Sequence, residues 1–304
     1  MPLPRFLSAL QSAAACGMIG ENMRGDTKMK EKVLLLGANG LVGRAVAAAL
    51  REDYQIIPAA GHGTPEGGCY LPVEEPGRLT EVLELEAPEI VISSIRGDFG
   101  QQMAFHEALA ERLAGSGARL LYVSTANVFD GDLSQPWREA DMPRPESEYG
   151  VFKRNCEAML EERLGERLIV FRLPSVWSED CPRVRMLERH SRSGEAHHTW
   201  RGDAVNVALA RQVGDWARYV LGHGLRGIFH VGTTDMADYF AFEKMACEAL
   251  GIPEPAFEIE EVGWDAYQAV LPGREDIPEA MQLTVPEVLE RLRKYGGIDE
   301  KRNR

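Results

Sequence analysis

Between residues 31 and 180, short apolar runs rich in Val, Ile and Leu alternate with longer stretches that mix apolar and polar residues. The apolar runs have the length and composition of strands, and the stretches between them are typical of helices. Strands that alternate with helices form a parallel sheet with right-handed crossovers, so the pattern predicts an α/β fold with a doubly wound parallel sheet. The expected strands cover residues 33–36, 54–60, 89–95, 119–129 and 167–177, and the expected helices cover residues 41–50, 78–86, 101–117 and 148–165.

Beyond residue 180 the alternation becomes looser. An apolar run at residues 227–232 precedes an expected helix at residues 239–251, and a final helix is expected around residues 285–295. We interpret residues 31–180 as a dinucleotide-binding domain, for the reasons given below. Residues 181–304 then form a smaller substrate-binding lobe that is interleaved with it.

The first 30 residues are weakly apolar and are interrupted by Ser, Gln and Gly. We expect a disordered tail, or an upstream start with Met29 opening the domain, because the first expected strand follows Met29 almost directly. No segment has the length of apolar chain that crosses a membrane.

Three glycines at even spacing separate the first expected strand from the first expected helix. In the stretch VLLLGANGLVG they are Gly37, Gly40 and Gly43. Glycines at such a corner permit a tight turn and let the backbone approach a pyrophosphate at the helix N-terminus. The alternative is a glycine-rich corner without a ligand. Because strand, glycines and helix occur in the right order, we favour a Rossmann-like dinucleotide site.

Tyr149 and Lys153 lie four residues apart on the expected helix 148–165, so both side chains project from one face. A free tyrosine is a poor acid or base at neutral pH, and a neighbouring ammonium group favours the phenolate. We therefore expect Lys153 to lower the pKa of Tyr149. Ser124 and Thr125 come from the preceding expected strand, where a hydroxyl is placed to bind a substrate oxygen. The alternative is a solvated Tyr–Lys pair on an exposed helix.

The segments GANGLVG, STANVFDG, PWREADMPRPESEYGVFK and FRLPSVW together resemble the extended short-chain dehydrogenase/reductases. Within them, residues 31–180 are most similar to the dTDP-4-dehydrorhamnose reductase-like group of sugar-nucleotide enzymes. The resemblance implies that Thr125, Tyr149 and Lys153 are catalytic. Tyr149 would relay the proton, Thr125 would bind the reacting oxygen, and Lys153 would hold the nicotinamide ribose.

The sequence departs from this group in two places. Ala126 and Asn127 follow Thr125, where the related dehydratases carry an acidic pair, which argues against a dehydratase. The segment SSIRGDFGQQ, at residues 93–102, also differs from the group's usual Ala-rich turn. Arg96 and Asp98 would lie near the cofactor, in roles that the sequence does not assign.

The expected cofactor is NADP or NAD. The second strand ends in Ala59, Ala60, Gly61 and His62, without the acidic residue that favours NAD. Arg44 follows the glycines and could meet a 2′-phosphate, which slightly favours NADP, although a solvated first-turn arginine is an equal alternative. The expected cofactor-binding residues are Gly37, Asn39, Gly40, Leu41, Val42, Gly43, Arg44, His62, Ser93 and Lys153.

A formal net charge of −13 argues against nucleic acid as a partner. The five cysteines are scattered without a CxxC pair, which suits a reducing cytoplasm, and we expect no metal site. Residues 183–201 are locally basic. They are either a clamp for the diphosphate of a nucleotide sugar or, for most of these side chains, a solvated face.

We therefore expect a cytoplasmic NAD(P)-dependent oxidoreductase that reduces a nucleotide-linked keto-sugar or a similar carbonyl compound. One alternative is a sugar-nucleotide epimerase with the same three catalytic residues. The other is a regulatory subunit that binds the cofactor without turnover. The expected partner is a small molecule, and we allow for a homodimer.

Overall fold

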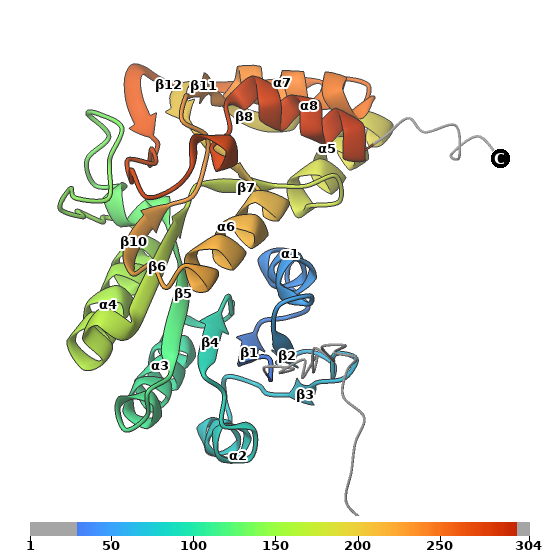
Figure 1. The fold of residues 1–304 in the computed structure, drawn as a ribbon. Helices are drawn as coiled ribbons and strands as arrows, with labels where there is room; N and C mark the ends of the chain where they lie inside the picture. The colour runs from blue at the N-terminus through green and yellow to red at the C-terminus, as the bar shows by residue number, and fades with distance from the viewer. Residues whose placement is uncertain (1–28, 297–304) are drawn as a thin grey trace, which may run out of the picture.

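The computed structural model describes residues 29–296, apart from the side chains of residues 264 and 265. Seven strands form the main sheet: β1 (Lys32–Leu36), β2 (Gln55–Ala60), β3 (Cys69–Tyr70), β4 (Ile90–Ser93), β5 (Arg119–Thr125), β6 (Leu168–Leu173) and β10 (Gly227–His230). Their order is β10-β6-β5-β4-β1-β2-β3, and neighbouring strands are parallel throughout (Figure 1). The strand order reverses between β1 and β4, which makes this a doubly wound sheet as predicted.

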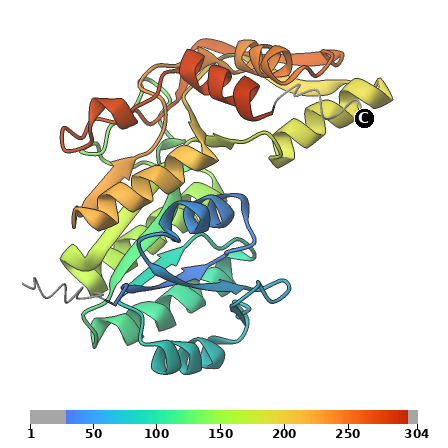
Figure 2. The ribbon, with the colours of Figure 1, turned by 45° about the vertical axis from the view of Figure 1, so that its right-hand side comes forward.

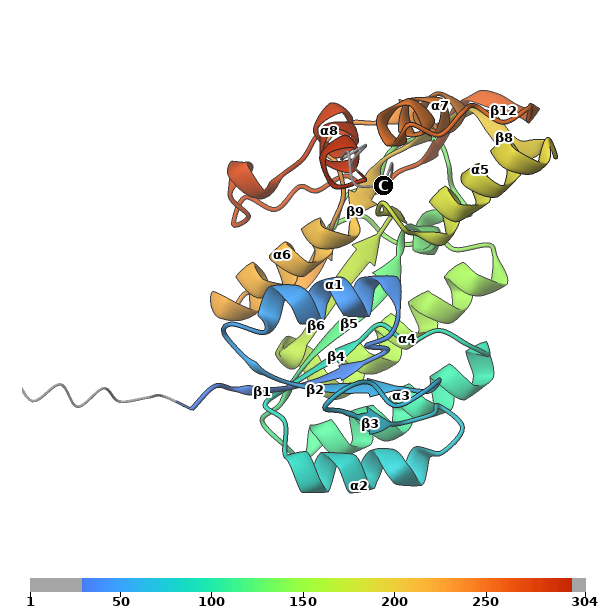
Figure 3. The same cartoon turned by 90° about the vertical axis from the view of Figure 1, so that its right-hand side faces the viewer.

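Helices cover both faces of the sheet, because alternate residues of each buried strand point to opposite sides (Figure 3). Val33 and Leu35 pack into one core with α1 and α6, while Leu34 and Leu36 pack into a second core with α2, α3 and α4. These helices are α1 (Leu41–Leu50), α2 (Pro76–Glu86), α3 (Phe99–Ala114), α4 (Glu148–Leu164) and α6 (Ala210–Gly222).

A second group of elements lies at one end of the main sheet (Figure 2). It surrounds its own core, in which Trp177 packs against Phe242. Its strands form a three-stranded sheet in the order β11-β8-β12 and a two-stranded sheet of β7 and β9. Between these strands the chain returns to the main sheet to supply α6 and β10. The members of the second group are β7 (Ser175–Trp177), α5 (Pro182–Ser193), β8 (His197–Val205), β9 (Val207–Leu209), β11 (Ala237–Asp238), α7 (Tyr239–Leu250), β12 (Phe257–Gln268) and α8 (Val285–Tyr295).

Two strands end four residues earlier than the sequence pattern predicted. The strand expected to reach residue 129 ends at Thr125, whose hydroxyl accepts a hydrogen bond from the backbone of Asn127 at 3.2 Å and caps the short 3₁₀ helix η1 (Ala126–Phe129). The strand expected over residues 167–177 is divided at Pro174. Because proline has no N–H for the sheet ladder, β6 ends at Leu173 and β7 pairs with β9 instead.

The remaining short helices are η2 (Gly165–Arg167) and η3 (Glu279–Met281). Except for residues 29 and 30, the tail predicted for residues 1–30 lies outside the described part of the chain. No helix within residues 29–296 is both long and apolar enough to span a bilayer. The division of the chain at residue 180 into two functional units stays a prediction.

Close packing of α1 on α6 yields a test of the fold. A Cβ at Gly214 of α6 would lie 2.6 Å from the Ala45 carbonyl oxygen of α1, whereas one at Gly222 of the same helix would lie 4.0 Å from its nearest neighbour. We expect Gly214→Ala to lower the free energy of unfolding by about 1–3 kcal/mol, because the helices must separate. Urea unfolding measures this, with Gly222→Ala as the matched control. Equal free energies of unfolding for the two variants would show that the contact between α1 and α6 does not require glycine at position 214.

Candidate active site

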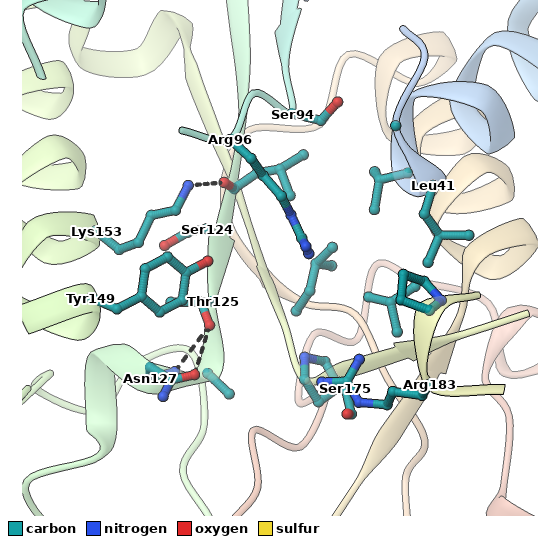
Figure 4. Close-up of a pocket in the computed structure, with 18 of the residues that line it drawn as sticks. Leu41, Ser94, Arg96, Ser124, Thr125, Asn127, Tyr149, Lys153, Ser175 and Arg183 are labelled. Carbon is teal, nitrogen blue, oxygen red and sulfur yellow. Dashed lines mark hydrogen bonds between the residues drawn. The ribbon is translucent and has the colours of Figure 1, made fainter. Parts of the chain in front are cut away.

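Ligands of open α/β sheets bind outside the carboxyl ends of the strands, at the point where the strand order reverses. A cavity of about 940 Å³ occupies this position, beyond the ends of β1 and β4 (Figure 4). On one side it is lined by the turn between β1 and α1, the residues after β2 and β4, and the end of β5. On the other side it is lined by residues of β7, α5, β8, α7 and β12. The cavity therefore lies between the main sheet and the second group of elements.

The three glycines of the first turn have different structural roles. Gly37 has φ +82°, a conformation that favours glycine, and a Cβ at Gly43 would lie only 2.2 Å from the Gly37 carbonyl oxygen. A Cβ at Gly40 would meet the same oxygen at 3.2 Å, which a small adjustment relieves. The fold itself therefore requires Gly37 and Gly43 more strongly than Gly40. Gly40 also lines the cavity, where the missing side chain leaves the N-terminus of α1 accessible to an anion.

Helix α4 is held against the end of β5 by its first turn. The Ser147 hydroxyl accepts a hydrogen bond from the Gly150 N–H at 3.0 Å and caps the helix. A Cβ at Gly150 would lie 2.2 Å from the Asn127 carbonyl oxygen, so only glycine permits this contact between α4 and η1. The contact places Tyr149 beside Thr125, and Figure 4 shows the two hydroxyl-bearing side chains together at the cavity wall.

Lys153 lies one turn further along α4 and is 5% exposed. Its ammonium group donates hydrogen bonds to the Val123 carbonyl oxygen at 2.9 Å and to the Tyr122 hydroxyl at 3.2 Å. Burial lowers the pKa of Lys153 to about 8, because desolvation disfavours the charged form. The amine nevertheless remains mostly protonated at neutral pH.

The structure corrects the expected effect of Lys153 on Tyr149. Burial raises the pKa of Tyr149 above its ordinary value, while the positive charge of Arg96 and a hydrogen bond with Thr125 act in the opposite direction. The desolvation of the phenolate is the largest effect, and Lys153 directs its hydrogen bonds to β5. Tyr149 is therefore a neutral phenol at physiological pH.

The segment after β4 contributes Arg96 to the cavity. Figure 4 shows its side chain extending into the space between α4 and the glycine turn. Asp98, which the sequence left without a role, caps α3 by accepting a hydrogen bond from the Gln101 N–H at 2.9 Å. Phe99 packs against Tyr149 with ring centroids 5.8 Å apart. Of the two charged residues that the sequence singled out here, Arg96 belongs to the site and Asp98 to the helix.

The other expected cofactor residues are divided between the cavity and its surroundings. Asn39, Leu41, Val42 and His62 line it, and the Asn39 amide donates to the His62 carbonyl oxygen at 2.9 Å. Arg44 is outside the lining residues. Its guanidinium donates to the Asn39 carbonyl oxygen at 3.0 Å and pairs with Asp180 at 3.3 Å, on the exposed surface.

The hydroxyl groups of two candidate serines bond to buried side chains. Ser93 is 1% exposed and hydrogen-bonds to His106 at 2.9 Å, so the cavity wall after β4 is formed by Ser94 instead. Ser124 lines the cavity, but its hydroxyl donates to a carboxylate oxygen of the buried Glu157. Thr125 is therefore the hydroxyl at the end of β5 that remains beside Tyr149.

The second group of elements contributes side chains that sequence reasoning missed or left undecided. Of the arginines in the basic stretch, Arg183 lines the cavity, whereas Arg185, Arg192 and Arg201 form ion pairs with neighbouring carboxylates. Asp203 lies in the mostly polar segment HHTWRGDAV of β8, where the sequence carries no signal that singles it out. Within residues 29–296, no cluster of His, Cys, Asp and Glu is arranged to hold a metal ion. The cavity-lining residues that the sequence analysis missed include Trp200, Asp203 and Tyr239.

Comparisons with known proteins agree with this architecture. The RmlD substrate binding domain matches residues 98–269, more than half of the chain. The chain is 30% identical over 167 residues to methionine adenosyltransferase 2 subunit beta of Xenopus laevis, a match that covers 50% of this chain and 49% of that protein. It thus spans about half the length of that relative.

The chain is also 25% identical over 256 residues to dTDP-4-dehydrorhamnose reductase of Escherichia coli (strain K12), covering 77% of this chain and 84% of that protein. Among solved structures, dTDP-4-dehydrorhamnose reductase of Bacillus anthracis str. Ames in complex with NADP has the same fold. Its TM-score is 0.72 at 21% identity, over 87% of this chain and 98% of that one. The resemblance recognised in the sequence is confirmed, and the chain belongs to the RmlD substrate binding domain family.

Proposed function

We propose that the protein is an NAD(P)-dependent reductase of a nucleotide-linked keto-sugar or a similar carbonyl compound. The observation that carries this proposal is a single cavity lined by both the glycine turn and the side chains of Thr125, Tyr149 and Lys153. A dinucleotide site and a proton-transfer site in one space are what carbonyl reduction requires. The names of the E. coli and B. anthracis relatives, and the NADP complex of the latter, support the same chemistry.

The residues present fit a dinucleotide. The space at Gly40 and the free N-terminus of α1 suit a pyrophosphate, because backbone N–H groups at a helix start attract anions. Lys153, on the opposite wall, would hold the ribose next to the nicotinamide. The chemistry that a bound nicotinamide supplies is hydride transfer to or from carbon. The side chains of this protein would bind the substrate and supply the proton.

Tyr149 would supply the proton. Because burial raises its pKa, the phenol is protonated at neutral pH and can donate to a carbonyl oxygen as that oxygen gains negative charge. Thr125 would hold the same oxygen in place from the end of β5. Alcohol oxidation, the first step of an epimerase cycle, needs a phenolate instead.

NADP is the cofactor that we favour. β2 ends in Ala59 and Ala60, and neither these residues nor Gly61 and His62 after them carry a carboxylate to bind a ribose hydroxyl pair. Arg44 contacts Asn39, whose amide in turn contacts the His62 backbone, so a guanidinium lies close to the lining of this part of the cavity. A 2′-phosphate there would compete with Asp180 for Arg44.

A regulatory subunit is the second candidate function. Its support is the similarity to methionine adenosyltransferase 2 subunit beta of Xenopus laevis, which is named as a subunit. Such a protein would need the cofactor cradle but not the proton donor. The two candidates therefore make opposite predictions for the hydroxyl of Tyr149.

Gly40→Val tests the dinucleotide site. We expect the variant to remain folded, because its Cβ meets one backbone oxygen at 3.2 Å, but to lose NADPH binding, because the side chain fills the approach to α1. Fluorescence titration with NADPH and a thermal melt measure the two properties. Unchanged affinity in a folded variant would exclude this turn as the cradle.

Arg44→Ala tests the cofactor preference. Losing a charge-assisted hydrogen bond to the 2′-phosphate should weaken NADPH binding by about 1–3 kcal/mol and leave NADH binding unchanged. Arg185→Ala is the matched control, because Arg185 pairs with the same Asp180 at 3.6 Å. Equal losses for both cofactors would show that Arg44 does not discriminate between them.

Tyr149→Phe tests the proposed function itself. Removing the hydroxyl should reduce keto-sugar nucleotide turnover by about 10²–10⁴-fold, the usual contribution of general acid–base catalysis, with little change in cofactor affinity. Lys153→Met should impair both turnover and cofactor binding, because Lys153 is proposed to touch the ribose. Absence of turnover in the wild type, combined with unchanged cofactor binding by Tyr149→Phe, would favour the regulatory subunit.

A further inference from the structure

Asp203 is a buried carboxylate in the half of the cavity that belongs to the second group of elements. The residue is 5% exposed and lines the cavity from β8. Among the described residues, its Oδ1 atom has no hydrogen-bond partner. A buried carboxylate oxygen without a donor is costly, so its presence requires an explanation beyond the fold.

The backbone around Asp203 is irregular. Gly202 has φ +91°, its N–H donates to an Asp238 carboxylate oxygen at 2.7 Å, and its missing Cβ would lie 2.6 Å from the Gly263 carbonyl oxygen. At this point the pairing with β12 changes register, between Glu261 and Ala266. Such irregularities redirect side chains and occur often beside functional sites. Here the irregularity directly precedes the carboxylate that lines the cavity.

The remaining contacts of Asp203 do not neutralise its charge. The backbone N–H of Gln268 donates to it, and Asp238 adds a second negative charge nearby. Burial raises the pKa of Asp203 to about 6, so it is mostly ionised at neutral pH although the fold disfavours that form. A residue that destabilises the folded state and faces a cavity is typical of a binding site.

The surroundings of Asp203 indicate what kind of group it meets. Trp200 is 39% exposed and lies with its ring 5.8 Å from that of Tyr239, and both line the cavity. Arg183, also in the lining, hydrogen-bonds to the Tyr239 hydroxyl. This half of the cavity thus combines aromatic rings, one cation and one open acceptor, which suits a nucleotide-linked ligand with donor groups.

We propose that Asp203 selects the substrate by accepting a hydrogen bond from it, either from a sugar hydroxyl or from an N–H of the base. The inference rests on the proposed function, because it takes the ligand to be a nucleotide sugar. Asp203 thereby becomes a specificity-determining residue on the wall opposite the glycine turn. The bond would supply the donor that Oδ1 lacks.

Asp203→Asn provides the test, because it keeps the shape of the side chain and removes the charge. We expect affinity for thymidine diphosphate glucose to fall roughly 10- to 100-fold, the range for a hydrogen bond to a charged group. The ligand-free variant should melt at a higher temperature than the wild type, because the buried charge is gone. Calorimetric titration in the presence of NADPH and a thermal melt measure these properties.

Two probes distinguish the donor. An equal loss of affinity for thymidine diphosphate places the donor on the nucleoside, and a loss confined to thymidine diphosphate glucose places it on the sugar. Glu261→Gln, which removes an exposed carboxylate of β12 outside the cavity lining, controls for net charge. It should bind both probes as the wild type does.

Other outcomes overturn the inference. Wild-type affinity for both probes in Asp203→Asn would show that Asp203 does not contact the ligand, and would leave the proposed function intact. A lower melting temperature would assign Asp203 to the stability of the fold. A wild type that binds NADPH but neither probe would overturn the substrate class and, with it, the role of Asp203.

Discussion

A buried ion pair beneath the cavity determines where the reactive side chains lie. Glu157 and Arg172 are 2% and 1% exposed, and their charged groups meet at 2.8 and 3.1 Å, with the Ser124 hydroxyl as a third partner. Removing two charges from water costs several kcal/mol per ion, which only close geometry offsets, so α4 has little freedom to slide or rotate. Tyr149, Lys153 and Glu157 are successive i, i+4 positions of α4. The ion pair therefore fixes the positions of the Tyr149 phenol and the Lys153 ammonium group along β5.

The same interaction also influences the second group of elements. Arg172 belongs to β6, which ends one residue later at Leu173, and Pro174 then leads the chain into β7. β7 pairs with β9 and is the first element of the second group. β6, which the ion pair joins to α4, therefore leads directly into the opposite wall of the cavity. The distance between Tyr149 and the opposite wall of the cavity thus depends on one well-anchored strand.

The sequence predicted those parts of the site that depend on local spacing. The glycine turn and the i, i+4 pair of Tyr149 and Lys153 are recognisable because strand, turn and helix follow each other directly in the chain. The direction of each polar side chain was not predictable in this way. Ser93 turns towards His106 and Lys153 towards β5, because buried polar groups bond to whichever partner the fold brings near. Asp203 faces the cavity through pairing with β12, which lies far away in sequence.

Gly40 and Asp203 share a property that relates fold to function. Packing alone does not explain either residue. The fold tolerates a Cβ at Gly40 after a small adjustment, so it does not require glycine there. Burial disfavours the negative charge of Asp203. Both residues line one cavity from its two walls. Pockets for one small-molecule ligand measure roughly 300–1,000 Å³, and this cavity of about 940 Å³ lies near the upper end of that range. Two ligands that meet between these walls, one held at Gly40 and the other at Asp203, would account for the two residues and would bring their reacting ends together beside Tyr149.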